Sequence, residues 1–183
     1  MKQGFVKVAS ATPRIRVADP VYNAQVICEQ AKEAAEHGAK IVVFPELCIT
    51  GYTCNDLFLQ ELLLEKAKEA LLTIAEETGQ LETLFLVGLP VDKDGRLYNV
   101  AAVLYRGRIL GMIPKKNIPM YAEFYEGRHF TPGEETVTEY RLGKQVIPFG
   151  SNLLFRCEEL PELVLGCELC EDLWVAEPPS TSH

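Results

Sequence analysis

The sequence predicts a layered α/β protein that folds as a single domain over residues 1–183. Strand-like and helix-like segments alternate through its first half in the order β-α-β-α-β, and antiparallel strands are expected after them. Hydrophobic residues make up 48% of the chain, which is enough to bury a sheet and the helices packed on it in one core.

Five segments define the alternating first half. Residues 5–10 alternate between apolar and polar side chains with period two, which predicts a strand. Residues 21–36 and 62–78 place apolar side chains at helical spacing and are followed by glycine stops, so both are predicted to be helices. Residues 41–44 and 84–89 are continuous apolar runs, typical of strands that are covered on both faces.

The second half has a different pattern. Residues 97–105 and 109–113 are predicted to form a β-hairpin around an Arg-Gly-Arg turn. Residues 114–135 are rich in Pro, Gly, aromatic and charged residues and are expected to be mostly loop. Residues 176–183 close no expected element, so the chain is expected to be cut inside a loop. Further strands are expected at 146–149, 152–157 and 163–167.

Charge and hydropathy narrow the classes of function. The formal net charge is -8, and the acidic residues are spread along a chain that has no basic block. This argues against nucleic acid or an anionic membrane surface as the main partner. No apolar run approaches the roughly 20 residues that span a bilayer. Residues 1–6 lead directly into the first strand pattern without a signal peptide, so the expected location is the cytoplasm.

The six cysteines are irregularly spaced and mostly lie in apolar surroundings, which suits reduced thiols. Cys167 and Cys170 form a C-x-x-C pair. A zinc site would need a second pair or nearby histidines, which are absent from this part of the sequence, so no metal is expected. A redox pair usually opens a helix, whereas here only Cys170 lies at the expected junction. Cys167 is expected to be a core residue.

Cys170 is the candidate nucleophile. It follows the apolar run at 163–165, and Glu171-Asp172 after it could open a helix. A sharp turn between a strand and a helix presents a side chain to a pocket, and the N–H groups of a helix start favour a thiolate.

Two further residues end predicted strands. Glu46 follows the strand at 41–44, where partial burial would let it take and return a proton near neutral pH; the alternative is a solvated loop glutamate. Lys115 follows the strand at 109–113 and could lower the pKa of a nearby thiol and stabilise an oxyanion. Taken alone, Lys115 suits a surface position better, and the adjacent Lys116 competes for any role.

Glu, Lys and Cys at the ends of three strands resemble the nitrilase, or carbon–nitrogen hydrolase, superfamily. The matching motifs are Phe-Pro-Glu-Leu at 44–47, Pro-Lys at 114–115 and Cys-Glu-Asp at 170–172. The fold implied by the resemblance is a four-layer α-β-β-α sandwich. The chain also resembles the glutaminase domain of glutamine-dependent NAD synthetases, and the segments that carry this narrower likeness are 51–58, 119–126, 171–175 and 178–180.

The resemblance implies roles for these residues. Cys170 would attack the side-chain amide of glutamine, Glu46 would act as general base and acid, and Lys115 would support the tetrahedral oxyanion. Glu126 matches a second glutamate of the pocket, and two close carboxylates help one another to hold a proton. The residues that match the glutamine site or the ammonia route, with simple packing as the alternative, are Tyr52, Tyr121, Phe124 and Glu171. Arg128 and His129 match no catalytic position.

The chain also departs from the family pattern. Glutaminase domains of this kind continue with further strands and a serine-containing segment that grips the substrate, and no ATP-pyrophosphatase loop is found here. By resemblance, residues 1–183 are the N-terminal two-thirds of the domain, truncated at the C-terminal side, and the synthetase domain is absent. The cofactors ATP and Mg, and the partner deamido-NAD, are implied only for that missing domain. A homo-oligomer is implied, and the chain alone is expected to be inactive.

Two other functions stay open. One is a stand-alone amidase of the same superfamily that acts on a small ω-amide or carbamoyl compound; the segments 56–58 and 121–126 argue against it. The other is a non-catalytic scaffold that keeps the fold only for assembly. An intact set of Glu46, Lys115 and Cys170 argues against the scaffold.

Overall fold

The structure is a computed structural model that describes residues 4–183. Within this range a mixed seven-stranded sheet has the order β1-β2-β3-β4-β5-β7-β6, and β8 and β9 form a separate antiparallel pair. The strands are β1 (Val8–Ser10), β2 (Ile41–Val43), β3 (Leu84–Lys93), β4 (Arg96–Tyr105), β5 (Arg108–Pro114), β6 (Thr138–Leu142), β7 (Gln145–Phe149), β8 (Phe155–Arg156) and β9 (Val164–Leu165).

The sheet changes from parallel to antiparallel along its width. β1, β2 and β3 pair in parallel, and the chain returns between them through helices, as parallel pairing requires. β3, β4 and β5 form an antiparallel meander, which contains the predicted hairpin. β7 then pairs in parallel with β5 and antiparallel with β6. The parallel half brings the carboxyl end of β2 to the same sheet edge as the end of β5.

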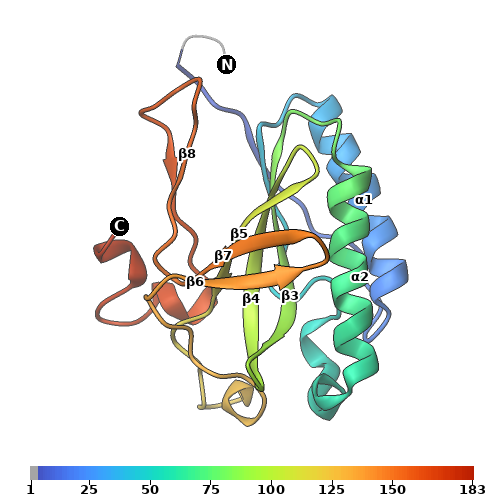
Figure 1. The fold of residues 1–183 in the computed structure, drawn as a ribbon, viewed down its shortest axis with the longest axis vertical. Coiled ribbons are helices and arrows are strands. Elements are labelled where there is room, and N and C mark those ends of the chain that lie inside the picture. The colour runs from blue at the N-terminus through green and yellow to red at the C-terminus, as the bar shows by residue number, and fades with distance from the viewer. Residues whose placement is uncertain (1–3) are drawn as a thin grey trace.

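Two helices cover one face of the sheet, α1 (Pro20–Glu36) and α2 (Glu61–Glu77) (Figure 1). α1 begins where Pro20 occupies the first turn and Asp19 accepts a hydrogen bond from the backbone N–H of Tyr22 at 3.1 Å. The main core lies between these helices and the sheet. Its fully buried members include Ile27, Val42, Leu71, Ile74, Val87, Leu89, Val100 and Met112.

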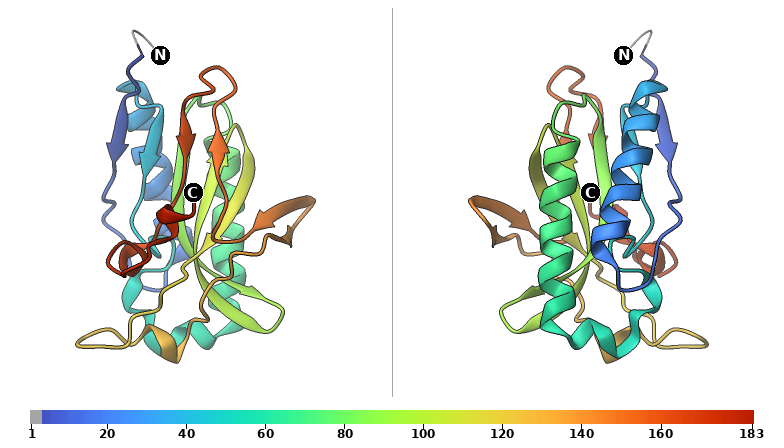
Figure 2. Two further views of the ribbon diagram at one scale, coloured as in Figure 1. Left: turned by 90° about the vertical axis from the view of Figure 1, so that its left-hand side faces the viewer. Right: turned by 90° about the vertical axis from the view of Figure 1, so that its right-hand side faces the viewer.

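The opposite face of the sheet carries the β8–β9 hairpin and the C-terminal segment, which Figure 2 shows on the side away from the helices. A smaller apolar cluster lies under them, formed by Ala101, Val103, Ile113 and Leu169. The described residues therefore contain a helix layer, the main sheet and a short second β layer. This arrangement confirms the layered α/β fold that the order of the elements predicted, and its layers are those of a truncated four-layer α-β-β-α sandwich.

Most predicted elements are confirmed within a few residues, but several boundaries were wrong. β6 was not expected; it forms because Tyr140 and Leu142 alternate inward while the strand pairs with β7. The first strand begins at Val8 rather than at residue 5. β8 and β9 are two residues each, because only that length finds a pairing partner.

Short 3-10 helices lie outside the longer elements. They are η1 (Tyr52–Leu59), η2 (Glu126–Arg128), η3 (Cys170–Leu173) and η4 (Pro179–Thr181). η2 falls in the segment predicted to be mostly loop, and η3 forms where a helix start was expected after Cys170. η4 corrects the expectation that residues 176–183 close no element, since Pro179 is buried and opens that turn.

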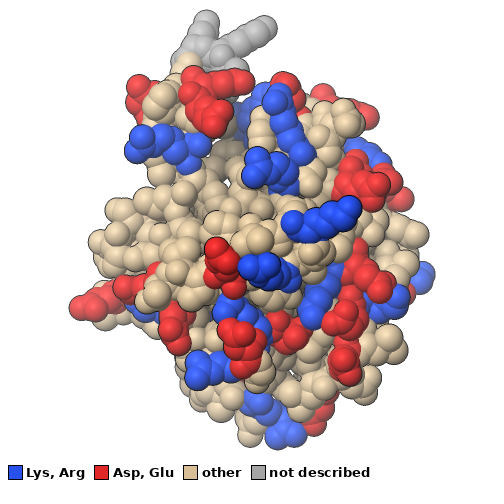
Figure 3. Space-filling view, viewed as in Figure 1, with Lys and Arg blue, Asp and Glu red and all other residues tan. Residues whose placement is uncertain are grey.

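The surface carries mixed charge on the face drawn in Figure 3, where Lys and Arg side chains lie among Asp and Glu side chains. Across residues 4–183 no helix has the length and apolar character needed to cross a bilayer. The expectation that residues 1–6 lack a signal peptide falls partly on residues 1–3, which lie outside the described residues.

Candidate functional site

Glu46 lies on a tight turn just beyond β2. Leu47 after it has a φ of 52°, in the left-handed region, and Gly51 N donates to Leu47 O at 2.7 Å to close the turn. The turn passes directly over Gly88 of β3, where a Cβ atom would stand 2.4 Å from Leu47 N and 2.7 Å from Pro45 O. Only a glycine allows this approach, so Gly88 fixes where the Glu46 carboxylate can stand.

Lys115 is fully buried at the end of β5 and bridges two carboxylates. Its Nζ lies 2.8 Å from Glu46 Oε1 and 2.7 Å from Glu126 Oε1. Burial by itself lowers the pKa of Lys115, but the hydrogen bonds with Glu126 and Glu46 raise it above its ordinary value. The buried ammonium is therefore held in its charged form, and the expectation of a surface lysine does not apply.

Asn99 and Tyr52 complete the set of hydrogen bonds around these carboxylates. Asn99 Nδ2 donates to Glu46 Oε1 at 2.5 Å and to Glu126 Oε2 at 3.4 Å. The Tyr52 hydroxyl donates to Glu126 Oε1 at 2.8 Å, and burial together with Glu126 raises the pKa of Tyr52. Sequence reasoning missed Asn99. Its position on β4, one strand away from the end of β5, was the signal that could have found it.

Cys170 is exposed and opens η3 with a φ of 46°, which is unusual for a residue other than glycine. Burial and then Glu46 raise the pKa of its thiol, while Lys115 lowers it, and the net shift is upward. A helix does begin at Cys170 as expected, but η3 is a single turn, and burial together with Glu46 outweighs the effect of Lys115 on the pKa of the thiol. A base is therefore needed to remove the thiol proton.

The remaining predicted residues form a second cluster near Cys170. The Tyr121 hydroxyl donates to Glu171 Oε2 at 2.7 Å, and the Tyr121 and Phe124 rings meet edge to face at 5.6 Å. Tyr121 and Glu171 thus come from loops about fifty positions apart and meet beside the nucleophile. The structure joins Tyr52 to the carboxylate cluster and the other three to this aromatic one.

Several candidates lie apart from this chemistry. Lys116 extends away from the site to Glu135 and is partly exposed. Arg128 forms a bidentate pair with Asp56, at 2.7 and 2.9 Å, and His129 Nε2 lies 3.0 Å from the same Asp56 Oδ1. These contacts tie η1 to η2, and they hold the segments that carry Tyr52 and Glu126.

The cysteines form no disulfide bond among the described residues, and they belong to no cluster of possible metal ligands there. All six cysteines are free, and Cys28, Cys48 and Cys54 are buried. Cys167 is partly buried beside the smaller apolar cluster rather than inside a strand. Over residues 4–183 no group of three His, Cys, Asp or Glu side chains could hold a metal ion.

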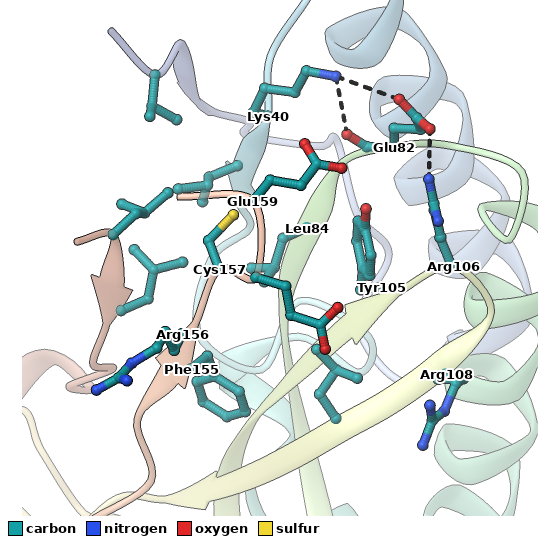
Figure 4. Close-up of a pocket in the computed structure, with 16 residues that line it drawn as sticks. Lys40, Glu82, Leu84, Tyr105, Arg106, Arg108, Phe155, Arg156, Cys157 and Glu159 are labelled. Atoms are coloured by element: carbon teal, nitrogen blue, oxygen red, sulfur yellow. Dashed lines mark hydrogen bonds and ion pairs between the residues drawn. The ribbon is translucent and has the colours of Figure 1, made fainter. Parts of the chain in front are cut away.

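A cavity of about 530 Å³ lies elsewhere, between the β8–β9 hairpin and the outer face of the sheet (Figure 4). Its lining includes Leu84, Tyr105, Phe155 and Cys157. Glu82 and Arg106 also line it, and they form an ion pair with 2.5 Å between Glu82 Oε1 and Arg106 Nη2. None of the lining residues belongs to the predicted site. The cavity therefore lies apart from the candidate site formed by Glu46, Lys115 and Cys170.

The family of this fold and site follows from comparison with known proteins. The carbon–nitrogen hydrolase family matches residues 7–180, so the chain belongs to that family. Among curated proteins, the glutamine-dependent NAD(+) synthetase of Mycobacterium tuberculosis is 40% identical over 98% of this chain and 26% of its own length. The synthetase of Thermotoga maritima is 32% identical over 100% of this chain and 28% of its own.

Solved structures give the same match. A glutamine-dependent NAD(+) synthetase from Cytophaga hutchinsonii superposes with a TM-score of 0.83 at 29% identity, over 91% of this chain and 28% of that one. An amidase from Nesterenkonia sp. superposes with a TM-score of 0.59 at 24% identity, over 78% of this chain and 54% of that one, a likeness of fold alone. The chain spans about a quarter of the length of the synthetases that it matches.

Proposed function

We propose that this chain is the ammonia-releasing part of a glutamine-dependent NAD synthetase, hydrolysing glutamine through a thioester on Cys170. One observation carries the proposal: Lys115 bridges Glu46 and Glu126 at 2.8 and 2.7 Å, in the electrostatic range of the Cys170 thiol. The names of the relatives, at up to 40% identity over nearly the whole chain, supply the substrate class.

The first step is formation of the thioester. Glu46 removes the proton from the Cys170 thiol, and the thiolate attacks the side-chain carbonyl carbon of glutamine. Both described contacts of Glu46 use Oε1, which leaves Oε2 to receive the proton. The carbonyl oxygen becomes an oxyanion. Lys115 has three N–H donors, of which Glu46 and Glu126 engage two, and the third can stabilise the oxyanion.

The second step releases the products. Glu46 returns the proton to the departing nitrogen as the C–N bond breaks, so that ammonia leaves and a glutamyl thioester remains on Cys170. Glu46 then takes a proton from a water molecule, which attacks the thioester. Glutamate leaves as the thiol regains its proton, and the balance is one water consumed for one ammonia and one glutamate formed.

Glu126, Asn99 and Tyr52 hold the base and the lysine in place. Glu126 is 5% exposed, and its carboxylate accepts hydrogen bonds from Lys115, Tyr52 and Asn99 together. Asn99 reaches Glu46 and Glu126 together and sets the distance between them. In this proposal Tyr121, Phe124 and Glu171 bind the glutamine, at the mouth of the site beside Cys170.

The wider assignments rest on the relatives and are part of the proposal. Residues 1–183 form the N-terminal part of the glutaminase domain, and ATP and deamido-NAD act in a synthetase part outside this chain. Homo-oligomers and a cytoplasmic location are proposed with it.

The test compares several amides as substrates of the natural polypeptide that carries this chain. Ammonia release is measured with glutamine, asparagine, a small ω-amide and a carbamoyl compound, with Cys170→Ala as the control variant. Saturable release from glutamine that is lost in Cys170→Ala supports the proposal. Preference for the small ω-amide or the carbamoyl compound points to a stand-alone amidase, and no release from any amide points to a non-catalytic scaffold.

A further inference from the structure

Asp172 is a buried carboxylate with an unusually full set of donors. It is 2% exposed, and four N–H groups of the described chain point at its two oxygens. Oδ1 accepts from Asn117 N at 2.7 Å and from Asn117 Nδ2 at 2.9 Å. Oδ2 accepts from Lys116 N at 3.3 Å and from Leu169 N at 3.2 Å.

The four donors belong to two segments that are far apart in the sequence. Lys116 and Asn117 directly follow Lys115 at the end of β5, while Leu169 directly precedes Cys170. A single carboxylate therefore joins the backbone next to the buried ammonium to the backbone next to the nucleophile. No other residue of the described chain bonds to both of these segments.

The backbone at Cys170 needs such support. Its φ of 46° lies in the left-handed region, which residues with a Cβ adopt only when the surroundings hold them there. Asp172 bonds the N–H of Leu169 on one side of Cys170 and belongs itself to the turn on the other side. A carboxylate suits this task because it accepts at both oxygens, whereas an amide would turn an N–H toward some of the four donors.

We propose that Asp172 is a positioning residue that fixes Cys170 relative to Lys115. This inference rests on the proposed function and extends it to a residue that touches neither the substrate nor the reacting atoms. Without Asp172 the turn at Cys170 relaxes, and the thiol, Glu46 and Lys115 no longer share one geometry. Misplacement of about 1 Å between reacting groups reduces a rate by about 100-fold.

The first test measures the coupling between Lys115 and Cys170 without any substrate. The rate of Cys170 alkylation by iodoacetamide at pH 7.5 is compared with and without Lys115→Gln, in the wild type and in Asp172→Asn. Lys115 favours the thiolate, so Lys115→Gln is expected to slow alkylation about tenfold in the wild type. In Asp172→Asn the same change is expected to alter the rate by less than about twofold. An equal effect in both backgrounds overturns the inference.

The second test is kinetic and uses the natural polypeptide with glutamine. Asp172→Asn is expected to lower kcat about 100-fold and to change KM by less than about tenfold, since Tyr121 and Phe124, two of the three side chains proposed to bind glutamine, lie outside the turn that relaxes. Glu177→Gln, an exposed change five positions away, is the matched control and should keep wild-type kinetics. A rise in KM with kcat unchanged, or no change in either constant, counts against a positioning role.

Failure of the two ideas can be told apart. If the wild type releases no ammonia from glutamine, the proposed function fails, and the alkylation comparison still decides the role of Asp172. If Asp172→Asn does not fold, Asn117→Ala serves instead, because it removes only the 2.9 Å bond from Nδ2. That variant should lower kcat about three- to tenfold and weaken the Lys115 effect on alkylation; wild-type values for both overturn the inference.

Discussion

The ammonium of Lys115 lies 2.8 Å from Oε1 of Glu46, a contact between the end of β5 and the turn after β2. The side chain of Lys115 is fully buried and that of Glu46 is 19% exposed, so only the Glu46 end of the pair reaches the surface. The second carboxylate, Glu126, balances the buried ammonium from the closed side. This asymmetry suits the proposed roles, in which Glu46 exchanges protons while Glu126 balances the charge of the lysine.

Lys115→Ala is expected to abolish glutamine-driven turnover, by 100-fold or more as is typical for loss of a group that stabilises an oxyanion. Synthesis from added ammonia should survive in the natural polypeptide. Lys116→Ala is the matched control, because that side chain bonds Glu135 away from the site. Steady-state rates with glutamine and with ammonia decide the matter, and a dead Lys116→Ala beside an active Lys115→Ala would reverse the assignment.

Glu46→Gln is expected to lower glutamine-driven turnover by about 100-fold or more, because the amide cannot accept the thiol proton. Its Oε1 can still receive Asn99 and Lys115, so the fold should persist. Glu135→Gln, an exposed glutamate outside the site, is the control. Turnover within tenfold of wild type would show that another group acts as the base.

Cys170 is expected to be the first thiol labelled by limiting iodoacetamide, as read by peptide mapping. It is exposed, whereas burial raises the pKa of Cys28 to about 11 and that of Cys48 and Cys167 to about 12. Because the pKa of Cys170 is itself raised, its labelling rate should keep climbing with pH beyond the ordinary thiol value of about 8.5. Earlier labelling of Cys54 or Cys157 contradicts this prediction.

Gly88→Ala is expected to destabilise the protein by about 1–3 kcal/mol, a typical effect of overpacking. The added Cβ would stand 2.4 Å from Leu47 N, so the Glu46 turn must move and glutamine hydrolysis should fall with stability. Denaturant unfolding and turnover are measured together. Gly150→Ala, whose nearest neighbours are 3.2 Å away, should have a smaller effect on both; equal effects would mean that the turn over Gly88 adapts freely.

The Asp56 clamp is expected to weaken in acid. Arg128, and then His129, hold the pKa of Asp56 well below its usual range. An unfolded aspartate titrates near about 3.9, so the clamp is fully present above that pH and is lost as the pH falls through the lower folded value. The protection of backbone amides against hydrogen exchange in residues 52–59 and 126–130, taken relative to the intrinsic exchange rate at each pH, should fall on acidification. Asp56→Asn should already show fast exchange at neutral pH, and unchanged exchange in that variant would exclude the clamp.

Local sequence patterns determined most of the elements. Helical spacing in residues 21–36 and 62–78 and the continuous apolar runs at 41–44 and 84–89 each predicted the correct element, because burial of one face or both leaves a period in the sequence. The ends of apolar runs also pointed to Glu46, Lys115 and Cys170 as candidates, since these residues lie two, two and five positions beyond such runs. Elements without such a period, η1 and η2, were missed.

Tertiary structure alone decided how these residues act together. Asn99 lies inside a buried strand and Asp172 beside the nucleophile, and neither position reveals that Asn99 meets Glu46 from 53 positions away or that Asp172 meets Asn117 from 55. The net rise in the pKa of Cys170 likewise depends on which carboxylates stand near it. The sequence by itself determined that Glu46 and Lys115 follow strands that end at one edge of the sheet, because strand ends follow from local pattern. Charge, burial and hydrogen bonding at that edge depend on through-space distances, which only the folded chain defines.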